Sequence, residues 1–265
     1  MPGLRMNCDP MNDTAAAFSD DAFLGGQLRL RQPRSGHRAG HDAMLLAAAT
    51  AACPGDRVAD LGAGVGAAGL ALARRIQGIA LTLVEVDSGL AALARHNAAD
   101  NAIAADVAEL DVTAGASAFA AAGLGPDSVD VVLTNPPFND GARHRASPDP
   151  VRASAHVAGP ATLEAWVHAA RRILKSGGSL TMIWRADGLA EVLAALSRGF
   201  GSLVVQPVHG EQGRPAIRIL VRAVKGGRAP TQILPAVMLN DTMGVPCPEV
   251  VAVLAGQGAL ALSGA

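Results

Sequence analysis

Short apolar runs alternate with longer amphipathic stretches through the middle of the chain, and this alternation predicts the secondary structure. The apolar runs predict seven β-strands, at residues 57–61, 80–86, 107–110, 129–134, 180–184, 202–208 and 216–224. The stretches between them predict helices at residues 66–76, 89–99, 161–174 and 188–198. Such alternation is typical of an open, mostly parallel, seven-stranded α/β sheet with helices on both faces. Because a short loop joins the last two strands, we expect them to form an antiparallel hairpin at an edge of the sheet.

The segments on either side of this core have other patterns and divide the chain into four regions. Residues 1–22 are small and polar with several acids, so we expect them to be disordered. Residues 23–56 predict an N-terminal extension, a hairpin or extended arm followed by a helix, over the cleft of the core. The core itself is residues 57–225. The C-terminal extension, residues 226–265, is rich in proline and ends in the apolar stretch 250–262, which we expect to pack on the core as a last helix.

Charge is distributed in blocks, although the chain of 265 residues has a net charge of −1. Four arginines and no acid lie between residues 28 and 41, whereas seven acids and no lysine or arginine lie between residues 97 and 142. A second basic cluster follows at residues 143–156. Such blocks are either solvated surface or two basic patches that flank a cleft. The near-neutral total argues neither for nor against a nucleic-acid partner.

The cysteines and the apolar runs bear on where the protein works. Cys8, Cys53 and Cys247 are too widely spaced for a disulfide framework or a zinc site, which suggests a reducing compartment. The histidines are not at ligand spacing, so we expect no metal. The N-terminus has no signal-peptide pattern, and the longest apolar run, residues 43–53, is too short to span a bilayer. We therefore expect a cytoplasmic protein without a membrane partner, either a monomer or a homodimer.

The turn after the first core strand, residues 60–66 with the sequence Asp-Leu-Gly-Ala-Gly-Val-Gly, is the first candidate site. Glycines there let a ligand approach the backbone closely, and open α/β sheets bind their ligands at such turns. Residues 64–69 also fit the G-x-G-x-x-G dinucleotide pattern. A nicotinamide or flavin enzyme is therefore an alternative.

Acids at the ends of three strands favour a different ligand. Asp60 would oppose a bound pyrophosphate but could bind an ammonium group through water. Glu85 and Asp87 could hold both hydroxyls of a ribose, and Asp111 could read an adenine amino group. These features describe adenosine joined to a cationic amino acid, which is S-adenosyl-L-methionine. Asp87 could equally cap the next helix, and Asp111 could be an ordinary loop or capping acid.

Asn135, Pro136, Pro137 and Phe138 directly follow the strand at residues 129–134 and form the second candidate site. Proline cannot donate to a β-ladder and restricts the residue before it, so the tetrapeptide predicts a stiff platform at the carboxyl end of a strand. The Asn135 side-chain oxygen and the Pro136 carbonyl could accept both hydrogens of a planar amino group, and Phe138 could stack on its ring. The platform would then aim the nitrogen lone pair at a methyl donor.

The glycine-rich turn, the acidic end of the second strand and the Asn-Pro-Pro-Phe platform resemble the class I S-adenosylmethionine-dependent methyltransferases that act on amino groups. Residues 36–47, 152–156 and 214–218 further resemble segments of the bacterial tRNA(Val) adenine N6-methyltransferases. The resemblance implies a Rossmann-like fold, S-adenosyl-L-methionine as cofactor and tRNA as partner. The cofactor-binding residues that it implies are Asp60, Gly62, Gly64, Gly66, Glu85, Val86, Asp87, Asp111 and Asn135. The implied catalytic residues are Asn135, Pro136, Pro137 and Phe138. The two basic runs would contact phosphates, and the RNA-binding residues that they predict are Arg34, His37, Arg38, Arg143, Arg145 and Arg152.

These inferences predict an enzyme that methylates the exocyclic amino group of an adenine in tRNA. The nearest alternative keeps the N-methyltransferase and changes its acceptor to a protein glutamine, ribosomal RNA or a small molecule. A NAD-binding oxidoreductase and a non-catalytic RNA-binding protein are the alternatives from other classes.

Overall fold

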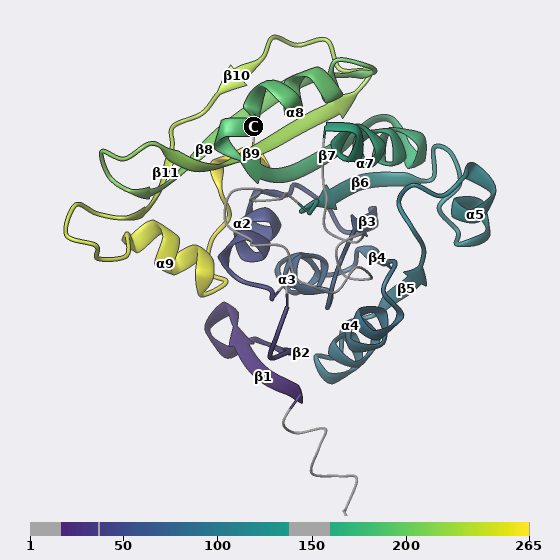
Figure 1. The fold of residues 1–265 in the computed structure, drawn as a ribbon, viewed down its shortest axis with the longest axis horizontal. Helices are drawn as coiled ribbons and strands as arrows, with labels where there is room; N and C mark the ends of the chain where they lie inside the picture. Colours follow the sequence, from purple (N-terminus) through teal and green to yellow (C-terminus); the bar gives the residue numbers. More distant parts are fainter. Residues whose placement is uncertain (1–16, 37, 138–159, 265) are drawn as a thin grey trace, which may run out of the picture.

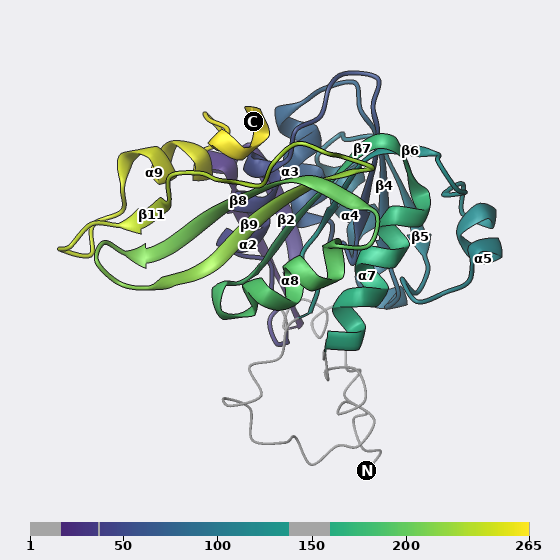
Figure 2. The same cartoon turned by 90° about the horizontal axis from the view of Figure 1, so that it is seen from above.

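The computed structural model describes residues 17–36, 38–137 and 160–264, and its core is a twisted sheet with helices on both faces (Figures 1 and 2). The core elements follow the predicted alternation. They are β3 (Arg57–Leu61), α3 (Ala67–Arg75), β4 (Ala80–Glu85), α4 (Ser88–Asp100), β5 (Ala105–Glu109), α5 (Ala116–Ala121), β6 (Val129–Thr134), α7 (Pro160–Ile173), β7 (Leu174–Arg185), η2 (Ala186–Gly188), α8 (Leu189–Leu196), β8 (Phe200–Glu211) and β9 (Ala216–Lys225).

Further elements come from the two extensions. The N-terminal ones are β1 (Phe18–Phe23), η1 (Leu24–Gly26), β2 (Leu28–Pro33) and α2 (His41–Ala49). The C-terminal ones are β10 (Gln232–Ile233), β11 (Val237–Asn240), α9 (Pro248–Leu254) and η3 (Ala261–Gly264). In the described part of the chain the main sheet has the order β10-β8-β9-β7-β6-β3-β4-β5, with β11 also paired to β8. The strands from β7 to β5 run parallel, and β9 is antiparallel to both β7 and β8.

Two apolar clusters hold the layers together, one on each face of the sheet. Leu45 of α2 and Leu70 of α3 pack with Leu83 on one face. On the other face, Trp166 of α7 and Leu196 of α8 belong to the second cluster, and Figure 2 shows α7 and α8 on the same side. The central strands are buried on both faces, so they appear in the sequence as continuous apolar runs.

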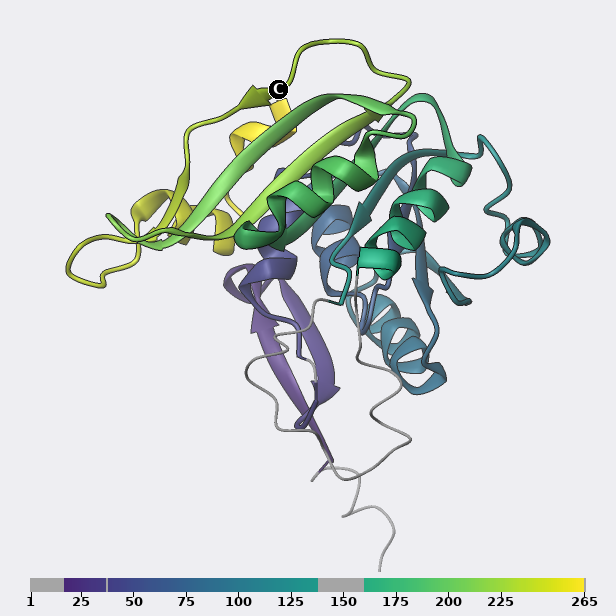
Figure 3. The same ribbon diagram turned by 45° about the horizontal axis from the view of Figure 1, so that its top comes forward.

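The N-terminal extension confirms the predicted hairpin but corrects its start. β1 begins at Phe18, inside the segment expected to be disordered, and pairs antiparallel with β2 along its whole length. Its two acids do not prevent pairing, because Asp20 lies opposite Arg31 of β2 and Asp21 forms an ion pair with Arg38 beyond that strand. Figure 3 shows the hairpin extending away from the sheet.

Local structure differs from its prediction at two further places. The strand predicted at residues 180–184 begins earlier, since β7 starts at Leu174 and is irregular between the pairs Val129–Leu174 and Val131–Ser179. A Cβ at Gly178 would lie 2.9 Å from the Asp130 carbonyl oxygen, so glycine serves close strand packing there. The short helix α5 was not predicted, because its alanine-rich sequence has no clear period.

The C-terminal extension also differs from its prediction. It contributes β10 and β11 as well as the helix α9, which is shorter than the apolar stretch that predicted it. Both short strands pair with β8. The β8–β9 hairpin is antiparallel as expected, but the C-terminal extension covers its outer strand, so it is not the bare edge of the sheet (Figure 1).

Candidate functional site

The carboxyl ends of β3, β4 and β6 meet at one edge of the sheet. Leu61 of β3 is level with Val84 of β4 and with Thr134 of β6. The residues that follow these three positions are the glycine turn (residues 62–66), the acidic end of β4 and the Asn-Pro-Pro platform. The fold therefore brings both candidate sites to neighbouring positions.

Two glycines of the glycine turn have different physical reasons to be glycine. Gly62 has φ +69°, and a Cβ there would lie 2.3 Å from Cη2 of Trp166, so the indole ring occupies that space. Gly64 has φ +57°, and its Cβ would meet no described atom within 4 Å. Gly62 is thus needed for packing, whereas Gly64 leaves an open side on which a ligand can approach the backbone.

Asp60 lies beneath the glycine turn and is 2% exposed. Its Oδ2 accepts a hydrogen bond from the Gly69 backbone N–H of α3 at 2.8 Å. Burial raises the pKa of Asp60 to about 7; the Gly69 hydrogen bond opposes this rise, and the charge of Glu85 adds to it. The carboxyl group therefore titrates near neutral pH, and a cationic ligand nearby would favour its ionised form.

Glu85, the last residue of β4, binds two backbone N–H groups with its side chain. Its Oε2 accepts a hydrogen bond from the Gly64 N–H at 2.8 Å, and its Oε1 accepts one from the Asp87 N–H at 2.9 Å. A carboxylate oxygen has two lone pairs, so each oxygen can still accept a ligand hydroxyl. Glu85 joins the glycine turn to the end of β4.

The remaining predicted cofactor residues lie at the exposed surface of this edge. Val86 is 66% exposed, which is unusual for a large apolar side chain directly after a buried strand. The Asp87 side chain accepts from the Leu90 N–H and caps α4, as the alternative interpretation held. The Asp111 side chain accepts from the backbone and the hydroxyl of Thr113 in a loop. Both acids thus have local partners as well as free lone pairs.

The platform begins where β6 ends. Asn135 is half-buried, Pro136 is buried and Pro137 is exposed, while Phe138 lies outside the described residues. The Asn135 Oδ1 atom is buried and has no hydrogen-bond partner among the described residues. A buried carbonyl oxygen without a donor costs free energy, and a ligand that donates a hydrogen bond would remove that cost.

These features fit a ligand that carries a cation, a ribose and a flat apolar ring. Asp60 supplies negative charge, Glu85 supplies acceptors and Val86 supplies an apolar surface. Within the described ranges there is no group of three or more His, Cys, Asp or Glu side chains that could hold a metal. No helix in the same ranges is long and apolar enough to cross a bilayer.

The predicted RNA-binding residues are only partly described. His37, Arg143, Arg145 and Arg152 lie outside the described residues. Arg34 is exposed at the end of the hairpin.

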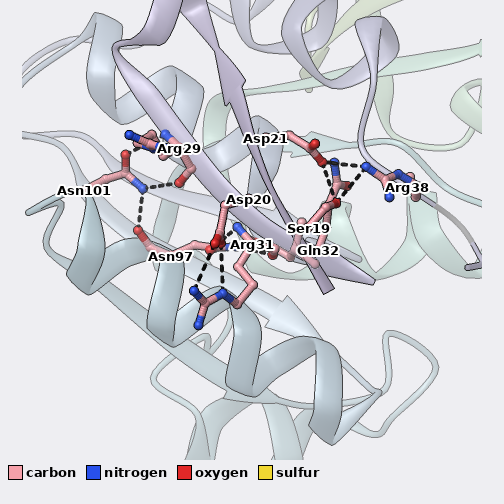
Figure 4. Close-up of polar contacts among 10 residues, drawn as sticks. Ser19, Asp20, Asp21, Arg29, Arg31, Gln32, Arg38, Asn97 and Asn101 are labelled. Carbon is pink, nitrogen blue, oxygen red and sulfur yellow. Dashed lines mark hydrogen bonds and ion pairs between the residues drawn. The ribbon is translucent and has the colours of Figure 1, made fainter. Parts of the chain in front are cut away.

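Acids from β1 meet two arginines of the first basic block. Nη2 of Arg38 lies 2.5 Å from Asp21 Oδ2, and Arg31 binds Asp20 at 2.9 Å (Figure 4). The hydrogen bond from Arg31 also holds the pKa of Asp20 below its ordinary value. The N-terminal basic block is thus less positive than its sequence suggests.

Two structurally important residues were not predicted from the sequence. Trp166 of α7 lies against Gly62, and one of two tryptophans in a chain this poor in aromatics was a signal worth following. Asn97 of α4 is buried and bonds both to β2 and to the glycine turn. Its signal is a pair of asparagines, Asn97 and Asn101, spaced four apart at the end of an alanine-rich helix.

Residues 39–209 match the profile of a family described as "Methyltransferase small domain". Two tRNA1(Val) (adenine(37)-N6)-methyltransferases, from Erwinia tasmaniensis and Dickeya chrysanthemi, are 26% and 27% identical to the chain over 215 residues. These matches cover 80% of this chain and 84% and 83% of the two relatives. A release factor glutamine methyltransferase from Chlorobaculum tepidum is 28% identical over 59% of this chain, and the chain spans 55% of the length of that relative.

Solved structures agree with the fold. A predicted O-methyltransferase from Agrobacterium tumefaciens is 34% identical, with a TM-score of 0.69 over 83% of this chain and 98% of that chain. The 16S rRNA N2 G1207 methyltransferase of Thermus thermophilus, solved with AdoMet and guanosine, is 21% identical, with a TM-score of 0.55 over 78% of this chain and 50% of that one. The predicted class I fold is confirmed by these neighbours.

Proposed function

The chain belongs to the methyltransferase small domain family, and from this membership we propose that it methylates the exocyclic amino group of an adenine in tRNA. The family match confirms the methyltransferase class and, with it, S-adenosyl-L-methionine as the methyl donor. The adenine acceptor and the roles of individual residues are our proposal.

The observation that carries the choice of acceptor group is the buried Oδ1 of Asn135, which has no hydrogen-bond partner in the part of the chain that the structure describes. An adenine amino nitrogen is a poor nucleophile because its lone pair is delocalised into the ring. The Asn135 oxygen and the Pro136 carbonyl would accept its two hydrogens and hold the nitrogen in the geometry for in-line attack. A hydroxyl has one hydrogen to donate, so two acceptors suit an amino group better than the oxygen acceptor for which the Agrobacterium protein is named.

The residues of the glycine turn and the acidic strand ends would bind the donor. When bound, S-adenosyl-L-methionine supplies an electrophilic methyl group on a positively charged sulfur. Asp60 would balance the cationic amino-acid end, Glu85 would accept from the ribose hydroxyls, and Val86 would pack on the adenine. After methyl transfer the nitrogen is acidic and loses a proton without a strong base, so no general base is needed among these residues.

The extent of the sequence matches supports tRNA over a protein acceptor. The two tRNA methyltransferases align over more than four-fifths of their own length, whereas the glutamine methyltransferase aligns over about half of its length. A glutamine side chain nevertheless carries the same planar amide nitrogen, so a release factor is the second candidate acceptor. The proposal therefore needs an experiment that separates the two acceptors.

The test compares Asn135→Ala with the wild-type chain, using tritiated methyl transfer to bulk tRNA and to a release-factor peptide. We expect transfer to tRNA alone, and a fall in kcat of roughly 100-fold in the variant, because positioning would be lost. Binding of S-adenosylhomocysteine, measured by calorimetry, should change by less than about twofold, since the variant leaves the acids of the cofactor pocket in place. Asn240→Ala, which removes an amide from β11, is the matched control and should retain activity.

Nucleoside mass spectrometry of tRNA from cells with and without the gene completes the test. Loss of N6-methyladenosine on deletion is the expected result. An unchanged tRNA profile together with transfer to the release-factor peptide would replace tRNA by a protein acceptor. An equal loss of S-adenosylhomocysteine binding in Asn135→Ala would contradict the role assigned to that residue.

A further inference from the structure

Asn97 joins two segments that are distant in the sequence. Its Nδ2 donates to the Arg31 carbonyl of β2 at 3.0 Å and to the Val65 carbonyl of the glycine turn at 2.9 Å. Its Oδ1 accepts from the Arg31 N–H at 2.8 Å. The residue is 1% exposed. One buried amide thus satisfies both backbone groups of Arg31 in the hairpin (Figure 4). The same amide also satisfies one carbonyl of the turn that would bind the methyl donor.

Asn101, the residue directly after α4, bonds the hairpin in the same way but does not contact the glycine turn. Its Oδ1 accepts from the Arg29 N–H at 2.9 Å, and its Nδ2 donates to the Arg29 carbonyl at 2.6 Å and to the Asn97 carbonyl at 2.7 Å. Four helical residues rise about 6 Å and two strand residues rise about 6.8 Å, so the two amides match alternate residues of β2. The two side chains bond the backbone N–H and carbonyl groups of Arg29 and Arg31, as a neighbouring strand would. Only Asn97 also bonds the glycine turn.

β2 connects this contact to a residue that is predicted to bind RNA. The η1 turn, which connects β1 and β2, is held to the C-terminal part of the molecule, because Gln27 donates to the Ala255 carbonyl at 3.1 Å. From there β2 passes Asn101 at Arg29 and Asn97 at Arg31, and it ends at Pro33, just before the exposed Arg34. The strand therefore runs past the glycine turn toward a basic residue proposed to contact RNA.

We propose that Asn97 is a positioning residue that couples the hairpin, which leads to the predicted RNA contact Arg34, to the glycine turn that would bind the donor. This inference rests on the proposed function, because the hairpin and the turn have these roles only in that enzyme. A glycine-rich turn loses much conformational freedom when it binds a ligand. Anchoring Val65 to β2 restricts the turn beforehand, so a ligand at one site stabilises the other site as well.

The test uses Asn97→Asp and the matched control Asn101→Asp. Each change keeps an oxygen for the strand N–H but replaces the NH2 donor by an oxygen that faces carbonyl groups. In Asn97→Asp the contact with the glycine turn is lost, and we expect the Kd for S-adenosylhomocysteine to rise about tenfold. We also expect the KM for tRNA to rise, with a smaller change in kcat. In Asn101→Asp the Kd for S-adenosylhomocysteine should stay within about twofold.

Hydrogen exchange separates coupling from a purely structural role, because a purely structural role would not change the effect of S-adenosylhomocysteine on the β2 amides. S-adenosylhomocysteine should slow exchange of the β2 amides in the wild-type chain and in Asn101→Asp, but not in Asn97→Asp. If Asn97→Asp does not fold, Asn97→Ser removes the long amide without adding charge and serves in its place. The inference is overturned if the Asn97 variant and Asn101→Asp weaken S-adenosylhomocysteine binding equally. It is also overturned if S-adenosylhomocysteine leaves the exchange of the β2 amides unchanged in the wild-type chain.

These binding and exchange measurements need no acceptor, so they separate the two proposals. Intact coupling in a protein that does not methylate tRNA would refute the proposed acceptor alone. Methylation of tRNA without the difference between the two variants would refute the coupling alone.

Discussion

Burial changes the protonation of Asp60 near neutral pH. It is buried, and its pKa rises from 3.8 to about 7, chiefly because burial disfavours the charged form. Between these two pKa values the folded chain holds a proton that the unfolded chain has released. The free energy of unfolding should therefore fall as pH rises from about 4 to about 7 and level off above that.

The prediction is that Asp60→Asn removes this part of the pH dependence. The amide keeps an oxygen for the Gly69 N–H and carries no charge, so the variant should be the more stable chain at pH 8, and the difference should shrink toward pH 5. The slope of the difference should approach about 1.4 kcal/mol per pH unit below pH 7. Urea unfolding of both chains from pH 5 to pH 8 measures this difference in the free energy of unfolding. A difference that is constant over this range would show that the folded-state pKa is not raised.

At the scale of single elements, two glycines of the glycine turn, separated by one residue, have different roles: one in packing and one in the proposed binding of the donor. Gly62 lies against Trp166, whereas the position of a Cβ at Gly64 is open. Because both residues have positive φ, an alanine at either position adds about 1 kcal/mol of backbone strain. Only at Gly62 does it also add a steric clash.

We therefore predict that one substitution chiefly lowers stability and that the other chiefly weakens ligand binding. Gly62→Ala should destabilise the fold by roughly 2–4 kcal/mol, since overpacking adds to the strain. Gly64→Ala should cost about 1 kcal/mol but weaken S-adenosylhomocysteine binding by roughly tenfold, because its methyl group occupies the open side. Chemical denaturation and calorimetry on both variants separate the two effects. Equal stability loss in the two variants would argue against the division of roles.

The hairpin and the residues that follow it also contain two similar residues with different roles. Arg38 is bound to Asp21, to Ser19 and to the Pro33 carbonyl, whereas the Arg34 side chain has no hydrogen-bond or ion-pair partner in the described ranges. A cation without an internal partner is the better candidate for a phosphate contact.

The corresponding prediction concerns the salt dependence of tRNA binding. Arg34→Gln should reduce the slope of log K against log salt concentration by about one, as expected for the loss of one phosphate contact. Arg38→Gln should leave the slope nearly unchanged and should lower the melting temperature slightly instead, because it breaks a surface ion pair. Filter binding at several salt concentrations measures the slopes. If only Arg38→Gln lowers the slope, the assignment of these two arginines is reversed.

At the scale of the whole molecule, the C-terminal extension completes the core. Val237 and Val253 are buried in the same cluster as residues of α2 and α3, and the Leu260 N–H donates to the Ala48 carbonyl at 2.9 Å. β10 and β11 also cover β8. An uncovered strand edge favours association between chains.

A chain that ends at Gly227 should therefore melt roughly 10 °C or more below the full chain and should aggregate. It loses several buried apolar side chains, each of which contributes about 1.5–3 kcal/mol, and it exposes the β8 edge. Thermal unfolding followed by circular dichroism, together with size-exclusion chromatography, checks both effects. A truncated chain that melts and elutes like the full chain would show that the extension is dispensable for the fold.

Much of the core could be predicted from the sequence because its signals are local. β3 has the predicted bounds, and the glycine turn and the platform lie at the predicted strand ends. A strand buried on both faces must be apolar throughout, and a tight turn with positive φ favours glycine whatever surrounds it. Both requirements are visible within a few residues. The family and its methyl donor followed from these same short segments.

Features that depend on residues far apart in the chain needed the folded structure. Asp20 and Asp21 neutralise arginines that looked like a basic block, because β1 pairs with β2. Trp166 gives Gly62 its reason to be glycine, and Asn97 joins β2 to the glycine turn. Local sequence was enough for most of the elements, the fold class and the family. Charge balance, packing partners and coupling between segments act through space over a few ångströms, so only the folded chain could determine them.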